Sequence, residues 1–351
     1  MKILFIIAHF AKSGGQSVQA KRLIDELSKN NEIKVLCLNV KNENYLDLPK
    51  NTEVVGDLIF PKGIFQLLKK INEIGNNYDI VQVFDSYFAL PAVYLSKIKK
   101  PIVLRLGADP LLELRDKKRF IMFLGFYFLE KLMFRKVDFF IVNNTHYSSR
   151  IMKRKNLIFI PNGFYPINIK KKKDRKEFVL LYTGHVSRMK DIEFIVSAMQ
   201  ILKNCYLYIV GDISGEYRDY YQYLIKNYDT SNIEFVGKIH ANDIKNYAIK
   251  SDVFVFPSLK EGFPNSVLEA MFFGLPVVCR NIPGIINLIY HEQNGFLFNN
   301  KKEYIENVNK LKSTKKLREK IIKNSFCEIR KKYIISEVAK KYYNIYESLV
   351  S

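Results

Sequence analysis

Two α/β domains with parallel sheets are predicted by three features of this 351-residue sequence. Short apolar runs alternate with segments of helical spacing along the chain, which is typical of parallel sheets covered by helices. The length exceeds what one hydrophobic core usually serves. The alternation breaks at Pro161-Asn162-Gly163, which precedes a mostly basic run over residues 170–176. Proline and glycine end regular structure, so we expect the linker between the domains there.

The first domain is expected over residues 1–165. Its opening apolar run is too short to span a membrane and has no cleavage site, so it is predicted to be a buried strand. Apolar runs predict strands near residues 2–8, 33–38, 53–60, 79–84, 101–106, 138–143 and 157–160. Helical spacing predicts helices near residues 16–29, 64–75, 86–98, 111–135 and 145–153.

The second domain is expected over residues 166–332, where the alternation restarts. A helical tail follows from about residue 301, and a separate C-terminal helix is expected over residues 333–351. The predicted strands lie near residues 178–182, 205–210, 232–236, 253–256 and 275–279. Apolar residues of the last helix recur at helical spacing, namely Ile335, Val338, Tyr342, Ile345 and Leu349.

The charge of the chain points to anionic partners. Lys and Arg number 56 against 35 Asp and Glu, which gives a net charge of +21. Nucleic acid, an anionic membrane surface and phosphorylated substrates are all attracted to such a protein. No nucleic-acid recognition motif accompanies the charge and the basic residues are scattered, so nucleic acid is not the expected partner.

The cysteines favour a reducing compartment. The four lie far apart, and three fall in predicted strands, so isolated buried thiols fit better than disulfides or metal ligands. We therefore expect a cytoplasmic protein. The cysteines are Cys37, Cys205, Cys279 and Cys327.

Residues 256–279 form the most informative stretch. An apolar strand ends at Phe256, a loop with Pro257 and Gly262 follows, and a helix then runs until Gly274 stops it before another apolar strand. Ligands of open α/β sheets bind at the carboxyl ends of the strands, where this loop lies.

This loop offers two kinds of polar group. The backbone N–H groups of Gly262, Phe263 and Asn265 are expected to be unpaired at the positive end of the helix, which suits a phosphate or sugar oxygen. Glu261 precedes the helix and Glu269 lies about one turn inside it, where carboxylates can accept hydrogen bonds from sugar or ribose hydroxyls. Taken without context, two glutamates at this spacing would more often be an exposed and a helix-face residue without a ligand.

A second motif opens the second domain, where a strand ends at Gly184. The loop that follows carries His185, Arg188 and Lys190, and a helix starts near Asp191. Glycine permits close backbone approach and cations neutralise charge, as diphosphate binding at a strand-to-helix turn requires. On their own, the two cations would more often be solvated residues at a helix start.

Together the motifs resemble one enzyme family. Pro-Ser, Glu-Gly-Phe, Glu-Ala-Met, Gly and Pro-Val-Val fall in register over residues 257–278 and resemble the glutamate-x7-glutamate signature of the family 4 glycosyltransferases. The resemblance implies the GT-B fold, with two Rossmann-like domains facing across a cleft, and retention of configuration at the sugar. It implies that the first domain binds the acceptor, that the second binds the nucleotide sugar, and that the terminal helix crosses back to the first domain.

The resemblance also assigns roles in the second domain. Glu261 would approach the transferred sugar, and Glu269 would bind the ribose hydroxyls. The turn of Val236, Gly237 and Lys238 resembles the base-binding turn, whose backbone could bond a uracil or guanine edge. The residues that would meet the sugar and the diphosphate are Gly262, Phe263, Pro264, Asn265 and Ser266.

The loop after Gly184 is similar to the loop that holds the donor diphosphate in that family. Lys190 matches the family's lysine. His185 occupies the position of the family's arginine, which is a departure from the pattern. Either His185 makes a weaker contact or Arg188 substitutes for the arginine, and the sequence leaves both open.

Candidate residues of the first domain follow its first and fifth strands. Gly14 and Gly15 resemble the glycine pair that approaches donor phosphate and acceptor, although ordinary turns also contain such pairs. His9 is a candidate acceptor-site residue or an ordinary loop histidine. Many relatives carry a histidine after the fifth strand; this chain has none there, and Asp109 or Arg105 would take its place. Asp109 either orients a sugar hydroxyl or caps the following helix.

Residues 117–136 form a mostly apolar segment bracketed by cations. The segment cannot span a bilayer, but one face of it could enter an anionic interface. A buried helix of the first domain is the equal alternative. The basic charge of the domain favours peripheral contact with the inner face of the cell membrane, and therefore a lipid-carried acceptor.

The predicted activity is retaining transfer of a sugar from a nucleotide-diphosphate donor, expected to be UDP-linked, to an acceptor hydroxyl. A lipid-linked saccharide or surface-polysaccharide precursor is the expected acceptor. Glu261, Lys190 and Asp109 are the predicted catalytic residues, with Lys190 and either His185 or Arg188 stabilising the leaving diphosphate. The chain contains no Asp-x-Asp, so a metal-dependent site is disfavoured and no cofactor is expected.

Three other functions compete with this prediction. A sugar-nucleotide epimerase of the GT-B fold is the closest alternative, and a basic nucleic-acid-binding protein is a weaker one. A dinucleotide-dependent oxidoreductase needs Gly-x-Gly-x-x-Gly after a strand, with an acidic residue about 20 positions further on. The sequence lacks that motif.

Overall fold

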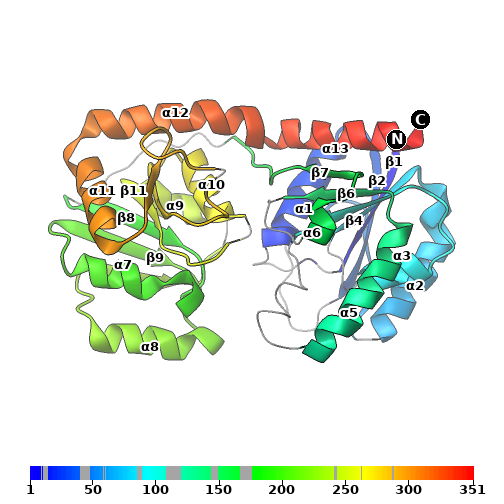
Figure 1. Cartoon of the computed structure of the whole chain (residues 1–351), viewed down its shortest axis with the longest axis horizontal. Helices are drawn as coiled ribbons and strands as arrows, with labels where there is room; N and C mark the ends of the chain where they lie inside the picture. The colour runs from blue at the N-terminus through cyan, green and yellow to red at the C-terminus, as the bar shows by residue number, and fades with distance from the viewer. Residues whose placement is uncertain are drawn as a thin grey trace. The chain divides into compact units, whose positions relative to one another are not determined.

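The structure is a computed structural model that divides into two compact units. Unit 1 comprises Met1–Gly163 and Tyr333–Ser351, and unit 2 comprises Phe164–Lys332. Each unit is a parallel sheet covered by helices (Figure 1). The residues described are 1–8, 10, 15–39, 48–57, 59, 61–84, 89–107, 120–143, 149–166, 176–240, 243–261, 263–286 and 288–351.

In the described part of unit 1, seven parallel strands form a sheet in the order β3-β2-β1-β4-β5-β6-β7. The strand order reverses between β1 and β4. Each predicted strand of the first domain is present. The strands are β1 (Lys2–Ile7), β2 (Glu32–Asn39), β3 (Thr52–Asp57), β4 (Ile80–Phe84), β5 (Ile102–Leu106), β6 (Phe139–Val142) and β7 (Leu157–Phe159).

The two faces of this sheet carry separate cores because successive strand residues point to opposite sides. Leu4 and Ile6 of β1 pack with α2, α3, α6 and the segment that ends α5. Ile3, Phe5 and Ile7 pack with α1 and α13. The helices are α1 (Gly15–Leu27), α2 (Lys62–Ile74), α3 (Ala89–Leu95), α5 (Phe120–Met133), α6 (Ser149–Met152) and α13 (Ile335–Val350); residues 111–119 of a predicted helix lie outside the described part.

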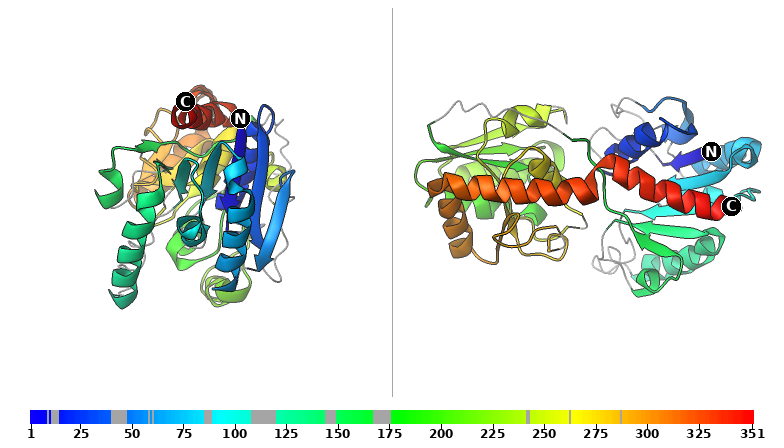
Figure 2. Two further views of the ribbon diagram at one scale, coloured as in Figure 1. Left: turned by 90° about the vertical axis from the view of Figure 1, so that its right-hand side faces the viewer. Right: turned by 90° about the horizontal axis from the view of Figure 1, so that it is seen from above.

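The helix α13 follows unit 2 in the sequence but completes the core of unit 1. It packs beside α1, as Figure 2 shows in red and blue. The buried Tyr346 hydroxyl donates a hydrogen bond of 2.7 Å to Oε1 of Gln82 in β4. The Gln82 amide in turn donates to the carbonyls of Val83 and Val103. A buried polar chain therefore fixes where α13 sits on the sheet.

Unit 2 repeats the topology, with six parallel strands in the order β10-β9-β8-β11-β12-β13 among its described residues. Here the strand order reverses between β8 and β11. The sequence did not predict β13, because its three residues are too short a run to be distinguished from a loop. The strands are β8 (Phe178–Thr183), β9 (Cys205–Val210), β10 (Ile233–Gly237), β11 (Val253–Phe256), β12 (Val277–Arg280) and β13 (Phe296–Phe298).

Helices connect these strands and then form the tail of the chain. The helix after β11 ends close to the predicted position, with Gly274 at φ 66° just beyond it. The predicted tail from about residue 301 is helical throughout its described length, in three pieces. The helices of this half are α7 (Ile192–Met199), α8 (Arg218–Asn227), α9 (Ile244–Ala248), α10 (Asn265–Phe272), α11 (Lys301–Ser313) and α12 (Lys315–Tyr333).

The cysteines occupy the positions that their sequence context predicts. Cys37, Cys205 and Cys279 are free thiols buried in strands, and Cys327 is exposed on α12. Burial raises the pKa of the Cys37 thiol to about 12. Burial also raises the pKa of Cys205 and Cys279, so the three buried thiols are un-ionised at neutral pH and serve as small packing groups.

We expect Tyr346→Phe to lower the free energy of unfolding of unit 1 by about 1–3 kcal/mol, because the Gln82 carbonyl would lose its donor inside the core. Urea denaturation followed by circular dichroism measures the change. Tyr343→Phe on the more exposed side of the same helix is the matched control and should stay within about 0.5 kcal/mol. Equal effects in the two variants would contradict the packing of α13 described above.

Candidate functional site

The candidate site lies at the carboxyl ends of β8 and β11, two strands that pair directly in unit 2. The strand order reverses between them, and this is where open α/β sheets form a ligand crevice. A single 3₁₀ turn, Arg188–Lys190, follows β8, and the loop that leads to α10 follows β11. Both glutamate-bearing and cation-bearing motifs of the sequence therefore meet at one edge of one sheet.

An ion pair joins these two loops. Lys190 Nζ contacts Glu261 Oε1, and both side chains are largely buried, with 23% and 14% of their surfaces exposed. Ser258, which is completely buried, donates a hydrogen bond of 2.9 Å from its hydroxyl to the same carboxylate oxygen. The Leu259 N–H also donates to the Met189 carbonyl at 3.1 Å. The Glu261 carboxylate is thus held by two donors, Lys190 from the turn after β8 and Ser258 from its own loop after β11.

The loop after β12 supports this arrangement from a third side. A side chain at Gly284 would place its Cβ 2.4 Å from the Glu261 carbonyl oxygen, so only glycine fits there. Arg280 donates from Nε to the Pro257 carbonyl at 2.7 Å and also contacts the Asp191 carboxylate. Asp191 stands in the left-handed region, at φ 49°, which aspartate tolerates better than most residues. Arg280 therefore ties the end of the 3₁₀ turn to the β11 loop.

The end of β8 makes close backbone contacts with the end of β9. Gly184 has φ 149°, and its N–H donates to the Val210 carbonyl at 2.9 Å. A Cβ at Gly211 would lie only 1.8 Å from the Gly184 carbonyl oxygen. The buried Tyr182 hydroxyl donates to the His185 carbonyl at 3.1 Å. These contacts fix the backbone on which His185 is presented.

The His185 ring is exposed on one side and stacked on the other. Its centroid lies 5.0 Å from that of Tyr217, at 27° between the planes. Desolvation, followed by the Lys190 ammonium, lowers the pKa of His185 below its ordinary value of 6.5. The ring is therefore neutral at pH 7 and can donate or accept a hydrogen bond, but does not act as a fixed cation.

Arg188, the other candidate for the family's arginine, interacts with α8. Its guanidinium lies 5.0 Å from the ring centroid of Tyr220 and 5.5 Å from that of Tyr223. The same loop therefore directs Lys190 to Glu261 and Arg188 to the tyrosines of a neighbouring helix.

The start of α10 differs from its prediction. Pro264 is the residue before the helix, where its carbonyl accepts from Val267 and Leu268, and the Asn265 N–H donates to the Phe263 carbonyl at 3.0 Å. The prediction of an unpaired Asn265 amide was wrong, because the chain turns tightly at Pro264 and satisfies that group locally.

The other predicted residues of this segment are partly accessible where they are described. Phe263, Ser266 and Glu269 are partly exposed, whereas Gly262 lies outside the described residues. Glu269 is on α10, about one turn from its start, as predicted.

The predicted base-binding turn ends β10. Gly237 has φ 80°, and its carbonyl accepts from the Gly211 N–H at 3.0 Å. Val236 is partly exposed, and the exposed Lys238 ammonium lies 4.0 Å from Asp212. Hydrogen bonds from Ser214 lower the pKa of Asp212.

No group of three His, Cys, Asp or Glu side chains suited to a metal ion occurs in the described part of the chain.

The candidates of the first domain belong to unit 1. His9, Gly14 and Asp109 lie outside the described residues, and Gly15 is the first residue of α1. Arg105 is the penultimate residue of β5 and has 2% of its surface exposed. It donates to Asn162 and lies 5.0 Å from the Phe84 ring. Its contact with an acceptor stays a prediction.

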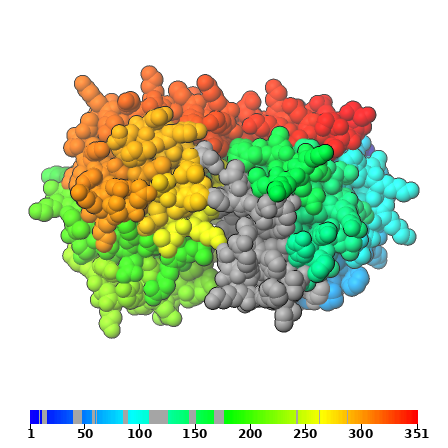
Figure 3. All heavy atoms as spheres, in the orientation of Figure 1, coloured from blue at the N-terminus to red at the C-terminus, as the bar shows by residue number. Residues whose placement is uncertain are grey.

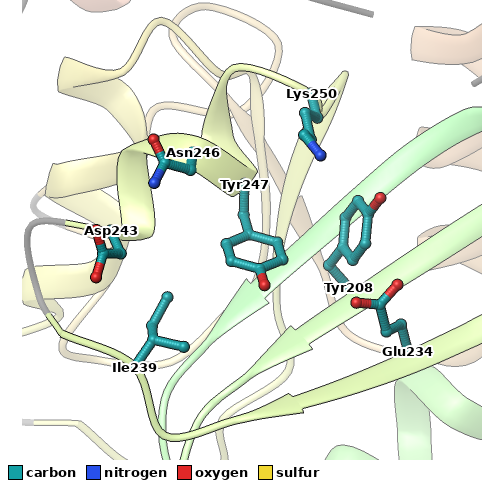
Figure 4. Close-up of a pocket in the computed structure, with 7 residues that line it drawn as sticks. All are labelled: Tyr208, Glu234, Ile239, Asp243, Asn246, Tyr247 and Lys250. Atoms are coloured by element: carbon teal, nitrogen blue, oxygen red, sulfur yellow. The ribbon is translucent and has the colours of Figure 1, made fainter. Parts of the chain in front are cut away.

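A separate pocket of about 490 Å³ opens on the β9–β10 side of the unit 2 sheet. Figure 4 shows the Tyr208 and Tyr247 rings side by side in it, with the Glu234 carboxylate near Tyr208. The ring centroids are 5.3 Å apart, edge to face. None of the residues that line this pocket belongs to the predicted site.

Three contributors to the site were not predicted. Ser258 orients Glu261, Arg280 links two loops, and Gly284 makes room for the Glu261 backbone. Ser258 stands three residues before Glu261, which is a usable local signal. Nothing in the sequence near Arg280 or Gly284 indicates their partners.

Comparison with known proteins identifies one family that matches within unit 2 and several relatives. Residues 166–326 match the family described as "Glycosyl transferases group 1". An uncharacterized glycosyltransferase of Methanocaldococcus jannaschii is 32% identical over 177 residues, 49% of this chain and 45% of that protein. The UDP-Gal:α-D-GlcNAc-diphosphoundecaprenol α-1,3-galactosyltransferase of Escherichia coli is 37% identical over 134 residues, 35% of this chain and 33% of that protein. The match thus covers less than half the length of these relatives.

Similarity to a solved structure extends over the whole chain. The structure of HepE from Anabaena, in complex with UDP and glucose, superposes with a TM-score of 0.79 over 99% of this chain and 100% of that one, at 19% identity. The predicted fold class, two parallel-sheet α/β domains of the GT-B type, is confirmed.

Stability should depend on pH through His185. The unfolded chain takes up a proton near pH 6.5, whereas the folded protein takes it up only at lower pH. The folded state should therefore lose stability as the pH falls from 6.5 towards the folded pKa. We expect His185→Gln to remove this component, as measured by urea denaturation at several pH values. Ring NMR signals that titrate at or above pH 6.5, assigned by their loss in His185→Gln, would contradict the described environment.

Proposed function

We propose that the protein is a retaining glycosyltransferase of family 4 that moves a sugar from a nucleotide-diphosphate donor to an acceptor hydroxyl. The observation that carries this proposal is the Lys190–Glu261 pair at the point where the strand order of unit 2 reverses. One cation for a diphosphate and one carboxylate for sugar hydroxyls lie there within contact of each other. The match of residues 166–326 to a glycosyltransferase family supports the same activity.

The two units would divide the work. Unit 2 would bind the donor through Gly184, His185, Lys190 and Glu261, together with Glu269 for the ribose. The backbone at Val236, Gly237 and Lys238 would meet the base, and α10 with its preceding loop would meet the sugar and diphosphate. Unit 1 would bind the acceptor, with His9, Gly14 and Asp109 as candidate contacts and Gly15 as a candidate contact for the donor phosphate.

The chemical problem is charge separation. The bond between the anomeric carbon and the phosphate oxygen breaks, so the carbon becomes cationic while the diphosphate leaves as an anion. Lys190 would stabilise that anion, and stabilisation of developing charge is usually the largest catalytic contribution. In the free protein the Lys190 ammonium contacts Glu261, so the donor would compete for a cation already held in place.

Retention requires the acceptor oxygen to attack from the face that the phosphate leaves. The new bond joins the acceptor oxygen to the anomeric carbon, and the hydroxyl proton passes to the departing phosphate oxygen. Glu261 would bind sugar hydroxyls and fix the orientation of the ring. No protein nucleophile is needed, and with no Asp-x-Asp in the chain we propose a metal-independent reaction.

We propose a UDP-linked hexose as the donor and a lipid-linked saccharide or polysaccharide precursor as the acceptor. The HepE structure holds UDP and glucose, which supports the nucleotide. The relative from Escherichia coli is named for a diphosphoundecaprenol acceptor, which supports a lipid-carried acceptor.

Incubation with UDP- and GDP-sugars, with and without lipid-linked acceptors, tests the activity. We expect a thermal shift with the correct donor, because ligands that bind only the folded state stabilise it by mass action. We expect product only when an acceptor is present. Conversion of the donor to an epimer without any acceptor would replace this proposal with a sugar-nucleotide epimerase.

We expect Glu261→Gln and Lys190→Ala each to lower kcat/KM by about 10²-fold or more, because each removes a charge placed at the reacting groups. Arg188→Ala is the matched control. It removes a cation from the same turn, but one that lies over tyrosine rings, and should change kcat/KM less than about threefold. A larger loss from Arg188→Ala than from Lys190→Ala would reverse their roles.

We expect Glu269→Ala to act mainly on donor binding, through a higher KM with little change in kcat. Titration of the donor into the purified variant by calorimetry measures the weaker binding directly. A lower kcat at unchanged KM would show instead that Glu269 acts on the chemical step.

A further inference from the structure

The helix α5 of unit 1 exposes an apolar face. The exposed fractions of Phe128, Leu129 and Leu132 are 66%, 55% and 40%. A side chain at Gly125 would meet no atom within 4 Å. These four residues, which we call the α5 stripe, are spaced i, i+3, i+4 and i+7 and therefore share one side of the helix. The atoms of α5 form part of the surface seen in Figure 3.

The opposite side of α5 is anchored, so its orientation is fixed by packing. Met133 and the following Phe134 are buried with α3 and α6 in the core of the sheet. The Phe134 ring packs edge to face on Phe140, at 5.0 Å between centroids. The α5 stripe is exposed because this buried side faces the core.

The exposed charged side chains next to the α5 stripe are positive. Lys131 and Arg135 are exposed next to it. Glu130, the single acidic residue in the α5 sequence, is buried, with 3% of its surface exposed. The apolar face is therefore flanked by cations.

The length of α5 limits what it can do in a membrane. Its 14 residues extend about 21 Å, short of the roughly 30 Å hydrocarbon core. No helix in the described residues is long and apolar enough to cross a membrane. An amphipathic helix with exposed aromatics and flanking cations instead lies in the plane of an anionic interface.

We propose that the α5 stripe docks unit 1 on an anionic lipid bilayer, with Phe128, Leu129 and Leu132 entering the interface and Lys131 and Arg135 contacting lipid headgroups. The lipid-carried acceptor of the proposed function gives this docking its purpose, so that the surface would deliver unit 1 to its substrate. A second copy of the chain fits less well, because a symmetric pair would place Lys131 and Arg135 of both copies together.

Co-sedimentation with vesicles tests the docking. We expect the full chain to pellet with vesicles of phosphatidylcholine and phosphatidylglycerol at low salt and to bind vesicles of phosphatidylcholine alone at least tenfold more weakly. High salt should weaken binding, because it screens the cations. Equal binding to both vesicle types, or none to either, overturns the proposal.

A variant of the α5 stripe and a control variant elsewhere on unit 1 test whether vesicle binding depends on the stripe or on exposed apolar side chains in general. We expect Phe128→Ser with Leu129→Ser to lower binding at least tenfold, because two apolar side chains no longer enter the interface. Phe65→Ser is the matched control, since Phe65 is 60% exposed on α2 of the same unit, and its binding should be unchanged. Equal losses in the two variants overturn the assignment to α5.

The role of Lys131 and Arg135 in vesicle binding is tested with a second variant and its control. We expect Lys131→Gln with Arg135→Gln to lower binding to anionic vesicles several-fold and to reduce its dependence on salt. Lys226→Gln on α8 of unit 2 is the matched control, an exposed lysine far along the sequence. A loss in Lys226→Gln as large as that in the double variant would show that net charge alone is responsible.

Two further measurements separate this proposal from the proposed function. UDP-sugar binding by the Phe128→Ser, Leu129→Ser variant should equal that of the unaltered protein, because α5 carries none of the proposed donor contacts, which lie in unit 2 apart from Gly15 at the start of α1. If the protein binds vesicles but no nucleotide sugar, the docking proposal stands and the proposed glycosyltransferase function is contradicted. Self-association in sedimentation velocity that this variant abolishes, with no vesicle binding, would assign the α5 stripe to a second copy.

Discussion

The contact between Lys190 and Glu261 is the constraint on which the candidate site depends. These residues are 71 positions apart in the sequence, yet they follow strands that pair directly in the sheet. A parallel sheet brings the ends of neighbouring strands together whatever their separation along the chain, and the ion pair then fixes how the two loops meet. Such a pair adds little net stability, because desolvation of the charges offsets their attraction. Its value lies in holding a cation and a carboxylate at a defined place.

The fold could be predicted because buried strands require apolar residues, which are recognisable in the sequence. Strands covered on both faces are largely apolar runs. In β1 and β8 the apolar run is continuous, whereas β4 and β5 are each interrupted by one polar residue, Gln82 and Arg105. The same rule fails for β13, which has three residues and whose neighbours do not extend the pattern. Glycine stops such as Gly274 mark helix ends for a different reason, since positive φ costs glycine least.

The candidate site could be predicted only in part, because sequence shows which groups are present and not where they point. Glu261 and Lys190 were recognised by a motif, and the structure brings them together. Whether His185 or Arg188 replaces the missing arginine depends on Tyr217, Tyr220 and Tyr223, which lie about 30 positions further on. The Asn265 amide is satisfied by a tight turn that depends on backbone angles at Pro264 and not on residue type alone.

The position of α13 affects the order in which the protein folds. Unit 2 is a continuous segment, so it can close its core as soon as that segment has left the ribosome. Unit 1 needs Val338, Tyr342 and Tyr346 to cover one face of its sheet, and these residues are synthesised only after the whole of unit 2. Until then α1 covers that face without α13, and Gln82 lacks the tyrosine hydroxyl that donates to it. The half of the molecule that is translated first is therefore the half that matures last.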